Sequence, residues 1–304
     1  LLSRHNTRTH DLKMQTHIDF DGIESLFRRA AQSNRNFLYE YEVYDFVRLS
    51  GGETPPRFSL LKRGERFHES LLDDLPGDKV VIKVVSPHIL HKSDVGGVQI
   101  CENKATSVLS TIRRMSCDIP EKLAAKIAAT NSITIPDWQG LHGNEVSCAI
   151  EKTIDGFLIC QYRRPDSEQF GGVLLLGLRN TREFGMILTA GLGGRDTELY
   201  AERFRKGQAV VSASVSMVSG DQFFELFQQT ISYRKLAGLT RGQQRIVTDD
   251  QLLECFTAFI EVGRYFSAET GNGNFLIEEL EINPFAFSDF LMMPLDGLCL
   301  FSTK

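Results

Sequence analysis

The stretch VVIKVVSPHILHKSDVGGVQI, residues 80–100, decides how the rest of the chain is interpreted. It opens with β-branched residues, which favour a strand over residues 79–86. Ser86-Pro87 breaks that strand, because a residue before proline and the proline itself punctuate regular structure. A polar, glycine-bearing turn follows and returns through Val98 and Ile100 as a second strand. The pattern predicts a strand–loop–strand unit, not a Walker A loop, which would lead into a helix.

Lys83 stands inside the first of these strands, between apolar β-branched neighbours on both sides. A lysine in such a position is costly to desolvate unless it meets an anion. Two interpretations stay open on this ground: an edge-strand lysine that reaches solvent, and a phosphate ligand that projects from a sheet face.

The turn that follows carries His88, His91 and Lys92 ahead of Gly96-Gly97. Two glycines allow positive φ and let backbone N–H groups approach an oxyanion closely. The same glycines also suit an ordinary polar hairpin tip. Because a lysine and a histidine stand beside the glycines, we favour a phosphate-binding turn over an ordinary hairpin tip.

Carboxylates occur at two further places where a strand is expected to end. Glu151 follows the apolar run 146–150, which we interpret as strand-like; its carboxylate could accept from ribose hydroxyls or an adenine amine, or pair with Lys152. In the strand 275–282, which ends in Asn283-Pro284, side-chain alternation places Glu279, Glu281 and Asn283 on one face. Asp296 follows on the next strand or turn, and converging carboxylate and amide oxygens suit Mg²⁺. The alternative is a solvated acidic face.

Composition excludes several classes of protein. The 304 residues carry 34 Lys and Arg against 39 Asp and Glu, a formal net charge of −5. This balance does not suggest non-specific nucleic-acid binding. No apolar stretch reaches the roughly 18 residues of a membrane helix, so no membrane association is expected. Six scattered cysteines without a CxxC pair indicate reduced thiols in a cytoplasmic protein.

The coarse order of elements favours an α+β (α/β) fold. Amphipathic helices are predicted over 21–33, 37–49, 221–236 and 249–266, and hairpin strands over 172–177, 186–190 and 287–301. The mixture lacks a regular βαβ alternation, which argues against a doubly wound sheet. We expect a flexible arm over 1–20, a helical segment over 21–77, a small lobe over 78–155 and a large lobe over 156–304.

Five segments in order resemble the ATP-grasp superfamily, and within it the ATP-grasp (β) subunit or domain of ADP-forming acyl-CoA synthetases such as acetate–CoA ligase; succinyl-CoA synthetase β is more distantly similar. They are LYEYEVYDFVRLSG (38–51), the opening stretch 80–98, EFGMILTAGLGG (183–194) with Glu198, KLAGLTRG (235–242) and IEELEINPFAF with LDG (295–297). The resemblance covers about residues 30–300. It implies an ATP-grasp fold, in which two lobes hold the nucleotide between them.

The resemblance also implies roles for particular residues. Lys83 matches the lysine on the nucleotide phosphates, Gly96 and Gly97 match the mobile loop over them, and Glu151 matches an acid that hydrogen-bonds the nucleotide. Asn283 and Asp296 match the Mg²⁺ ligands, with Glu281 close enough to serve as a further one. His91 matches a histidine that is implicated as a phosphate carrier in this branch.

The expected cofactors are therefore ATP and Mg²⁺, and the expected reaction converts acid, ATP and CoA into acyl-CoA, ADP and phosphate. The sequence departs from the pattern at Val173, where relatives carry glutamate, in the extra stretch 161–170, and in the end of LTRGQQRIVTDD. We expect a partner subunit or domain to supply CoA binding and the principal ligase histidine, and we expect an oligomer. The alternative is a catalytically incomplete module that senses nucleotide or acts as a scaffold. A carboxylate–amine ligase is disfavoured by the histidine loop.

Overall fold

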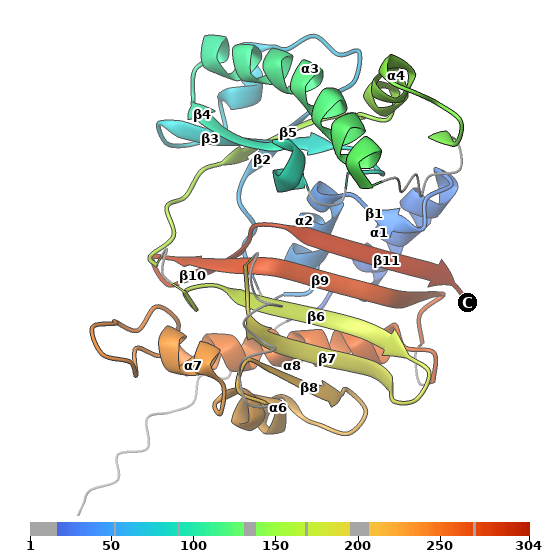
Figure 1. The fold of residues 1–304 in the computed structure, drawn as a ribbon. Coiled ribbons are helices and arrows are strands. Elements are labelled where there is room, and N and C mark those ends of the chain that lie inside the picture. The colour runs from blue at the N-terminus through green and yellow to red at the C-terminus, as the bar shows by residue number, and fades with distance from the viewer. Residues whose placement is uncertain are drawn as a thin grey trace, which may run out of the picture.

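Two β-sheets with helices packed against them make up the chain in the computed structural model (Figure 1). The structure describes residues 17–51, 53–89, 92–130, 138–167, 170–194, 207–269 and 272–304. The prediction of a mixed helix-and-sheet fold with two lobes is confirmed. No helix in the described ranges combines the length and apolar character that crossing a membrane requires.

The smaller sheet has four antiparallel strands in the order β2-β5-β3-β4. Their bounds are β2 Phe58–Lys62, β3 Lys79–Val85, β4 Val98–Glu102 and β5 Gly156–Gln161. The long helix α3 (Ala105–Thr130) covers one face, and α4 (Asn144–Lys152) packs on α3. Short 3-10 helices η1 (Glu69–Leu72) and η2 (Lys92–Val95) lie in the connections before β3 and β4. Because β3 lies between β5 and β4, Lys83 is on an internal strand, and the edge-strand interpretation is wrong.

The larger sheet has seven strands, ordered β1-β11-β9-β6-β7-β8, with β10 paired to β9. Their bounds are β1 Phe37–Leu38, β6 Leu174–Thr181, β7 Gly185–Leu192, β8 Val210–Ser214, β9 Phe275–Ser288, β10 Leu291–Pro294 and β11 Gly297–Thr303. All its pairings are antiparallel. Asp296 lies between β10 and β11, beside the middle of β9.

Helices α1 (Phe20–Gln32), α2 (Glu40–Leu49), α6 (Gly220–Phe227), α7 (Ile231–Leu236) and α8 (Asp249–Tyr265) accompany this sheet. Side-chain caps define where several begin. Asp19 accepts from the Gly22 amide at 2.8 Å, and Thr248 with Gln251 forms a capping box at the start of α8. The helix predicted over 221–236 is two helices, because Thr230 caps a new one.

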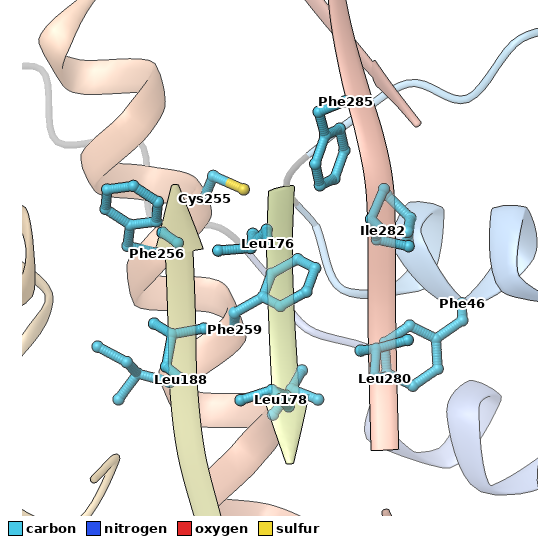
Figure 2. Close-up of a cluster of buried hydrophobic side chains, with 14 of the residues drawn as sticks. Phe46, Leu176, Leu178, Leu188, Cys255, Phe256, Phe259, Leu280, Ile282 and Phe285 are labelled. Atoms are coloured by element: carbon cyan, nitrogen blue, oxygen red, sulfur yellow. The ribbon is translucent and has the colours of Figure 1, made fainter. Parts of the chain in front are cut away.

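The main core lies between α8 and the face of the large sheet that bears Leu176, Leu188 and Leu280 (Figure 2). Phe256 and Phe259 of α8 reach this face, and Phe46 of α2 packs into the same cluster. Burial of each such side chain contributes about 1.5–3 kcal/mol. In β9 the buried Leu280 and Ile282 alternate with Glu279, Glu281 and Asn283, so these three share the opposite face, as predicted.

Helix α2 also touches the smaller sheet. Tyr44 is fully buried in a cluster with Val85, Leu158 and Cys160, and Tyr39 and Tyr41 pack at its border. The segment predicted as a lead-in to the small lobe, 21–77, therefore serves both sheets: β1 pairs with β11, and β2 pairs with β5. The domain boundaries themselves stay a prediction.

Candidate functional site

A buried cluster of charges joins the two sheets at the start of α2, and Lys83 is at its centre. The lysine is 7% exposed. Its ammonium lies 2.5 Å from Glu40 Oε1 and 3.0 Å from the Tyr44 hydroxyl, and it also donates to the carbonyl oxygen of Leu295. An ammonium has three hydrogens, so protein acceptors take all three. The anion that Lys83 requires is supplied by the chain itself.

Lys92 lies on the other side of the same carboxylate. Its Nζ is 3.0 Å from Glu40 Oε2 and 3.1 Å from Asp296 Oδ1. Lys92 belongs to η2 of the smaller unit, and Asp296 follows β10 of the larger sheet, so this ion pair crosses between the two. Side-chain exposure rises from 3% at Glu40 through 13% at Lys92 to 42% at Asp296. The cluster is therefore closed to solvent at Glu40, which we call its floor, and open to solvent at Asp296, which we call its mouth.

The charges in the cluster hold one another ionised. Burial alone would raise the pKa of Glu40, but Lys83 and Lys92 outweigh this effect and lower it to about 2. Burial alone would lower the pKa of both lysines, and the Glu40 carboxylate raises both instead. Burial and the nearby Glu40 charge raise the pKa of Asp296. The floor of the site is thus an ionised carboxylate between two ammonium groups.

The residues predicted to bind a metal lie next to this mouth. Asn283 donates its main-chain N–H to the Asp296 carbonyl at 3.2 Å, and its side chain donates to Glu281 Oε1 at 3.2 Å. Asn283 Oδ1 accepts from the Gly194 amide at 2.9 Å. Two carboxylates and one amide oxygen are hard oxygen ligands of the kind that Mg²⁺ prefers. Three protein ligands leave coordination positions free for phosphates and water. Among the described residues no three His, Cys, Asp or Glu side chains form a metal cage.

Gly96 and Gly97 lie between η2 and β4, where they shape a tight turn. Their amides donate to Ser93 O at 3.2 Å and to Lys92 O at 2.7 Å, so in this conformation both N–H groups serve the turn itself. Gly96 has φ +74°, and a Cβ on Gly97 would lie 2.8 Å from Lys92 O. The geometry supports the hairpin-tip interpretation and gives these glycines the task of placing Lys92.

Two other predicted site residues do not join the cluster. The run 146–150 is wrong as a strand: it belongs to helix α4, and Glu151 is exposed near the end of that helix. Since α4 packs on α3, on the outer face of the smaller sheet, the prediction that Glu151 acts from a strand has lost its basis. His91, like Glu198, lies outside the described residues.

A hollow of about 910 Å³ opens where the chain crosses from one sheet to the other. It is lined by Pro76, Gly77, Gln161, Tyr162, Arg163, Arg164, Pro165, Asp166, Ser167, Ser288 and Asp289. Gln161 pairs with Val80, three residues along β3 from Lys83, which is about 10 Å at 3.3 Å per residue. Residues 161–167, which belong to the extra stretch 161–170, supply most of the lining of this hollow.

Three members of the charge cluster were not assigned a site role from the sequence: Glu40, Tyr44 and Lys92. A signal for Glu40 exists in α2, because Glu40, Val43, Tyr44 and Val47 follow the i, i+3, i+4, i+7 spacing of one helix face. All four are buried. A carboxylate on a buried apolar face is costly unless a cation pairs with it. Lys83, which stands within an apolar strand, is a candidate for that cation.

Known proteins are similar to parts of this chain in sequence and to its fold. The family model of the ATP-grasp domain matches residues 29–152. The chain is 27% identical over 168 residues to acetate–CoA ligase (ADP-forming) I of Archaeoglobus fulgidus, and 22% identical over 212 residues to the ADP-forming acetate–CoA ligase of Methanocaldococcus jannaschii. These matches cover 55% and 69% of this chain, but only 18% and 24% of the curated relatives' lengths.

Solved structures extend the likeness to the whole fold. An acetyl-coenzyme A synthetase 1 of Ca. Korarchaeum cryptofilum, described as dinucleotide forming, matches with a TM-score of 0.65 and 22% identity over 92% of this chain and 99% of its own. A protein of Pyrococcus horikoshii Ot3 matches with a TM-score of 0.61 and 18% identity over 93% and 99%. The chain has the ATP-grasp fold. Its ATP-grasp domain is related in sequence to ADP-forming acetate–CoA ligases.

Proposed function

We propose that this chain is the ATP-binding part of an ADP-forming acyl-CoA synthetase, which forms acyl-CoA, ADP and phosphate from a carboxylic acid, ATP and CoA. The observation that carries the proposal is the meeting of Lys83, Lys92 and Asp296 at one junction between the two sheets. Both curated relatives have this activity in their names. Since they are several times longer, we propose that a partner domain or subunit binds CoA and the acid.

The nucleotide is proposed to lie across the junction. Its base enters the hollow at residues 161–167, and its phosphates extend toward the mouth formed by Lys92 and Asp296. Along β3, Val80 beside this hollow and Lys83 in the charge cluster are about 10 Å apart. Lys83 lies at the buried floor of the site, where it holds the Glu40 carboxylate that also contacts Lys92. Asp296, Asn283 and Glu281 would hold Mg²⁺, which supplies charge neutralisation and orientation of the phosphates when bound.

Phosphoryl transfer depends mainly on positioning and charge neutralisation. We propose that His91 accepts the γ-phosphoryl group through a neutral imidazole nitrogen, which is nucleophilic near pH 7 without a separate base. ADP leaves, and the phosphohistidine then transfers its phosphoryl group to the carboxylate of the acid in the partner, which forms an acyl phosphate and restores the imidazole. The thiol of CoA then attacks the acyl carbon and releases phosphate.

Equilibrium binding of ATP to the whole chain tests the proposal. We expect saturable binding that Mg²⁺ strengthens and that Lys83→Met weakens, because the Glu40 carboxylate then has Lys92 as its single buried cation. Circular dichroism confirms that the variant is folded. Lys104→Met is the matched control, because Lys104 pairs with Glu102 on an exposed surface just after β4. Absence of ATP binding to the wild type would contradict the proposal.

A further inference from the structure

The ion pair of Lys92 with Asp296 has the features of a contact that a bound anion can replace. Lys83 is fully committed, with three protein acceptors for its three hydrogens. Lys92, in contrast, is held by two carboxylates, and Glu40 Oε2 approaches it at 3.0 Å without a well-aligned hydrogen bond. The directional hydrogen bond of Lys92 is the one to Asp296 Oδ1, at 3.1 Å. Because its contact with Glu40 Oε2 depends mainly on charge, Lys92 can turn at Glu40 while it exchanges the bond to Asp296.

The partner of Lys92 lies at the accessible end of the cluster. Asp296 is 42% exposed, whereas Glu40 is 3% exposed. A polyanion that approaches the mouth therefore meets Asp296 and Lys92 before it can reach Glu40 or Lys83. The polyanion attracts Lys92 and repels Asp296, because like charges within a few ångströms disfavour each other.

We propose that Lys92 is a phosphate-binding residue and that its ion pair with Asp296 is the nucleotide-free form of the site. On nucleotide binding, phosphate oxygens replace the Asp296 carboxylate at Lys92, and Asp296 turns to Mg²⁺. Glu40 keeps Lys92 ionised and close to the mouth in both forms. The inference rests on the proposed function and adds a residue and an exchange of partners to it.

The exchange predicts an unusual effect of Mg²⁺ on binding, because Asp296 both repels phosphate and binds the metal. In Asp296→Asn the repulsion is lost together with the metal ligand. ATP affinity measured by calorimetry in EDTA should then rise about 3- to 10-fold, while the strengthening by Mg²⁺ decreases, because a neutral amide oxygen replaces the carboxylate. A misfolded variant cannot bind more tightly, so this pair of results separates the exchange from damage to the structure.

Lys92→Met should weaken ATP binding about 10- to 100-fold with and without Mg²⁺, as expected for loss of a charge-assisted contact. Lys92→Arg should recover part of it, and Lys104→Met should match the wild type. Thermal unfolding without ligand confirms that each variant is folded.

Two results would overturn the inference and leave the proposed function in place: wild-type ATP affinity in Lys92→Met, or an Asp296→Asn variant that loses affinity equally in EDTA and in Mg²⁺. A wild-type chain that binds no ATP would overturn both.

Discussion

Lys83 donates a hydrogen bond to the carbonyl oxygen of Leu295, although 212 positions separate the two residues in the sequence. One belongs to the smaller sheet and the other precedes the last strand of the larger one. The bond sets Asp296, the next residue, beside Lys92. The tertiary structure thereby brings the predicted phosphate lysine and a predicted metal ligand to one place.

The Glu40 carboxylate is the anionic centre of the cluster, so its removal should be costly. Glu40→Gln leaves two buried ammonium groups without their shared partner, and we expect a loss of about 3–5 kcal/mol in the free energy of unfolding. Urea denaturation measures it. Glu102→Gln, which removes one member of an exposed pair with Lys104, should leave the midpoint unchanged. Equal stability of Glu40→Gln and the wild type would contradict the cluster's role.

Acid should destabilise the wild type through the same carboxylate. The folded-state pKa of Glu40, about 2, lies below the ordinary value of 4.5, so its contribution is complete above about pH 4.5 and is lost as the pH falls toward 2. The difference in unfolding free energy between wild type and Glu40→Gln should shrink across that interval. A difference that stays constant from pH 5 to pH 2.5 would show that Glu40 is not held ionised.

Gly97 should tolerate no side chain. A Cβ there would lie 2.7 Å from Val84 Cγ1 and 2.8 Å from the main-chain oxygen of Lys92. Gly97→Ala should cost about 1–3 kcal/mol and weaken ATP binding, since the displaced backbone carries Lys92. Gly64→Ala is the control: its φ is also positive, at +81°, but nothing lies within 4 Å of the added atom. Similar losses of ATP affinity in both variants would contradict the account.

A phosphorylated histidine should form when the chain is incubated with γ-labelled ATP and Mg²⁺. The label should be acid-labile and absent from His91→Ala. His88→Ala should keep it, because His88 stacks edge-on against Trp138, with ring centroids 5.4 Å apart. If His91→Ala is still labelled, His91 is not the phosphate carrier.

Glu151 should be dispensable for nucleotide binding. It is exposed near the C-terminal end of α4, and Glu151→Ala should change neither ATP affinity nor unfolding by more than about 0.5 kcal/mol. Calorimetry and urea denaturation measure both. A tenfold weaker ATP affinity would restore the role that the sequence resemblance implies.

The sequence predicted the parts of the fold that local patterns encode. The run 79–86 was interpreted correctly from its β-branched composition, and the alternation in β9 from the period-two pattern of a single strand. The run 146–150 was misread, since a short apolar run fits either a strand or a helix, and packing on α3 decides for α4. β8 and β2 were missed because each is short and weakly patterned.

The candidate site was predicted only in part, for a related reason. Lys83, Asn283 and Asp296 carry local signals, and the structure brings them close to one junction. Helical spacing places Glu40 on the buried face of α2, but the partners of Glu40 and Lys92 come from distant segments, which periodicity does not encode. Gly96 and Gly97 were predicted to contact phosphate because the sequence shows their conformational freedom. It does not show that their amides donate to main-chain oxygens within the turn.

The most direct test of the central claim is a crystal structure of the chain with Mg²⁺ and a non-hydrolysable ATP analogue. We predict phosphate oxygens within hydrogen-bond distance of Lys92 Nζ, Asp296 turned to the metal, and the base in the hollow lined by residues 161–167. A triphosphate bound elsewhere, with the Lys92–Asp296 ion pair intact, would contradict the account.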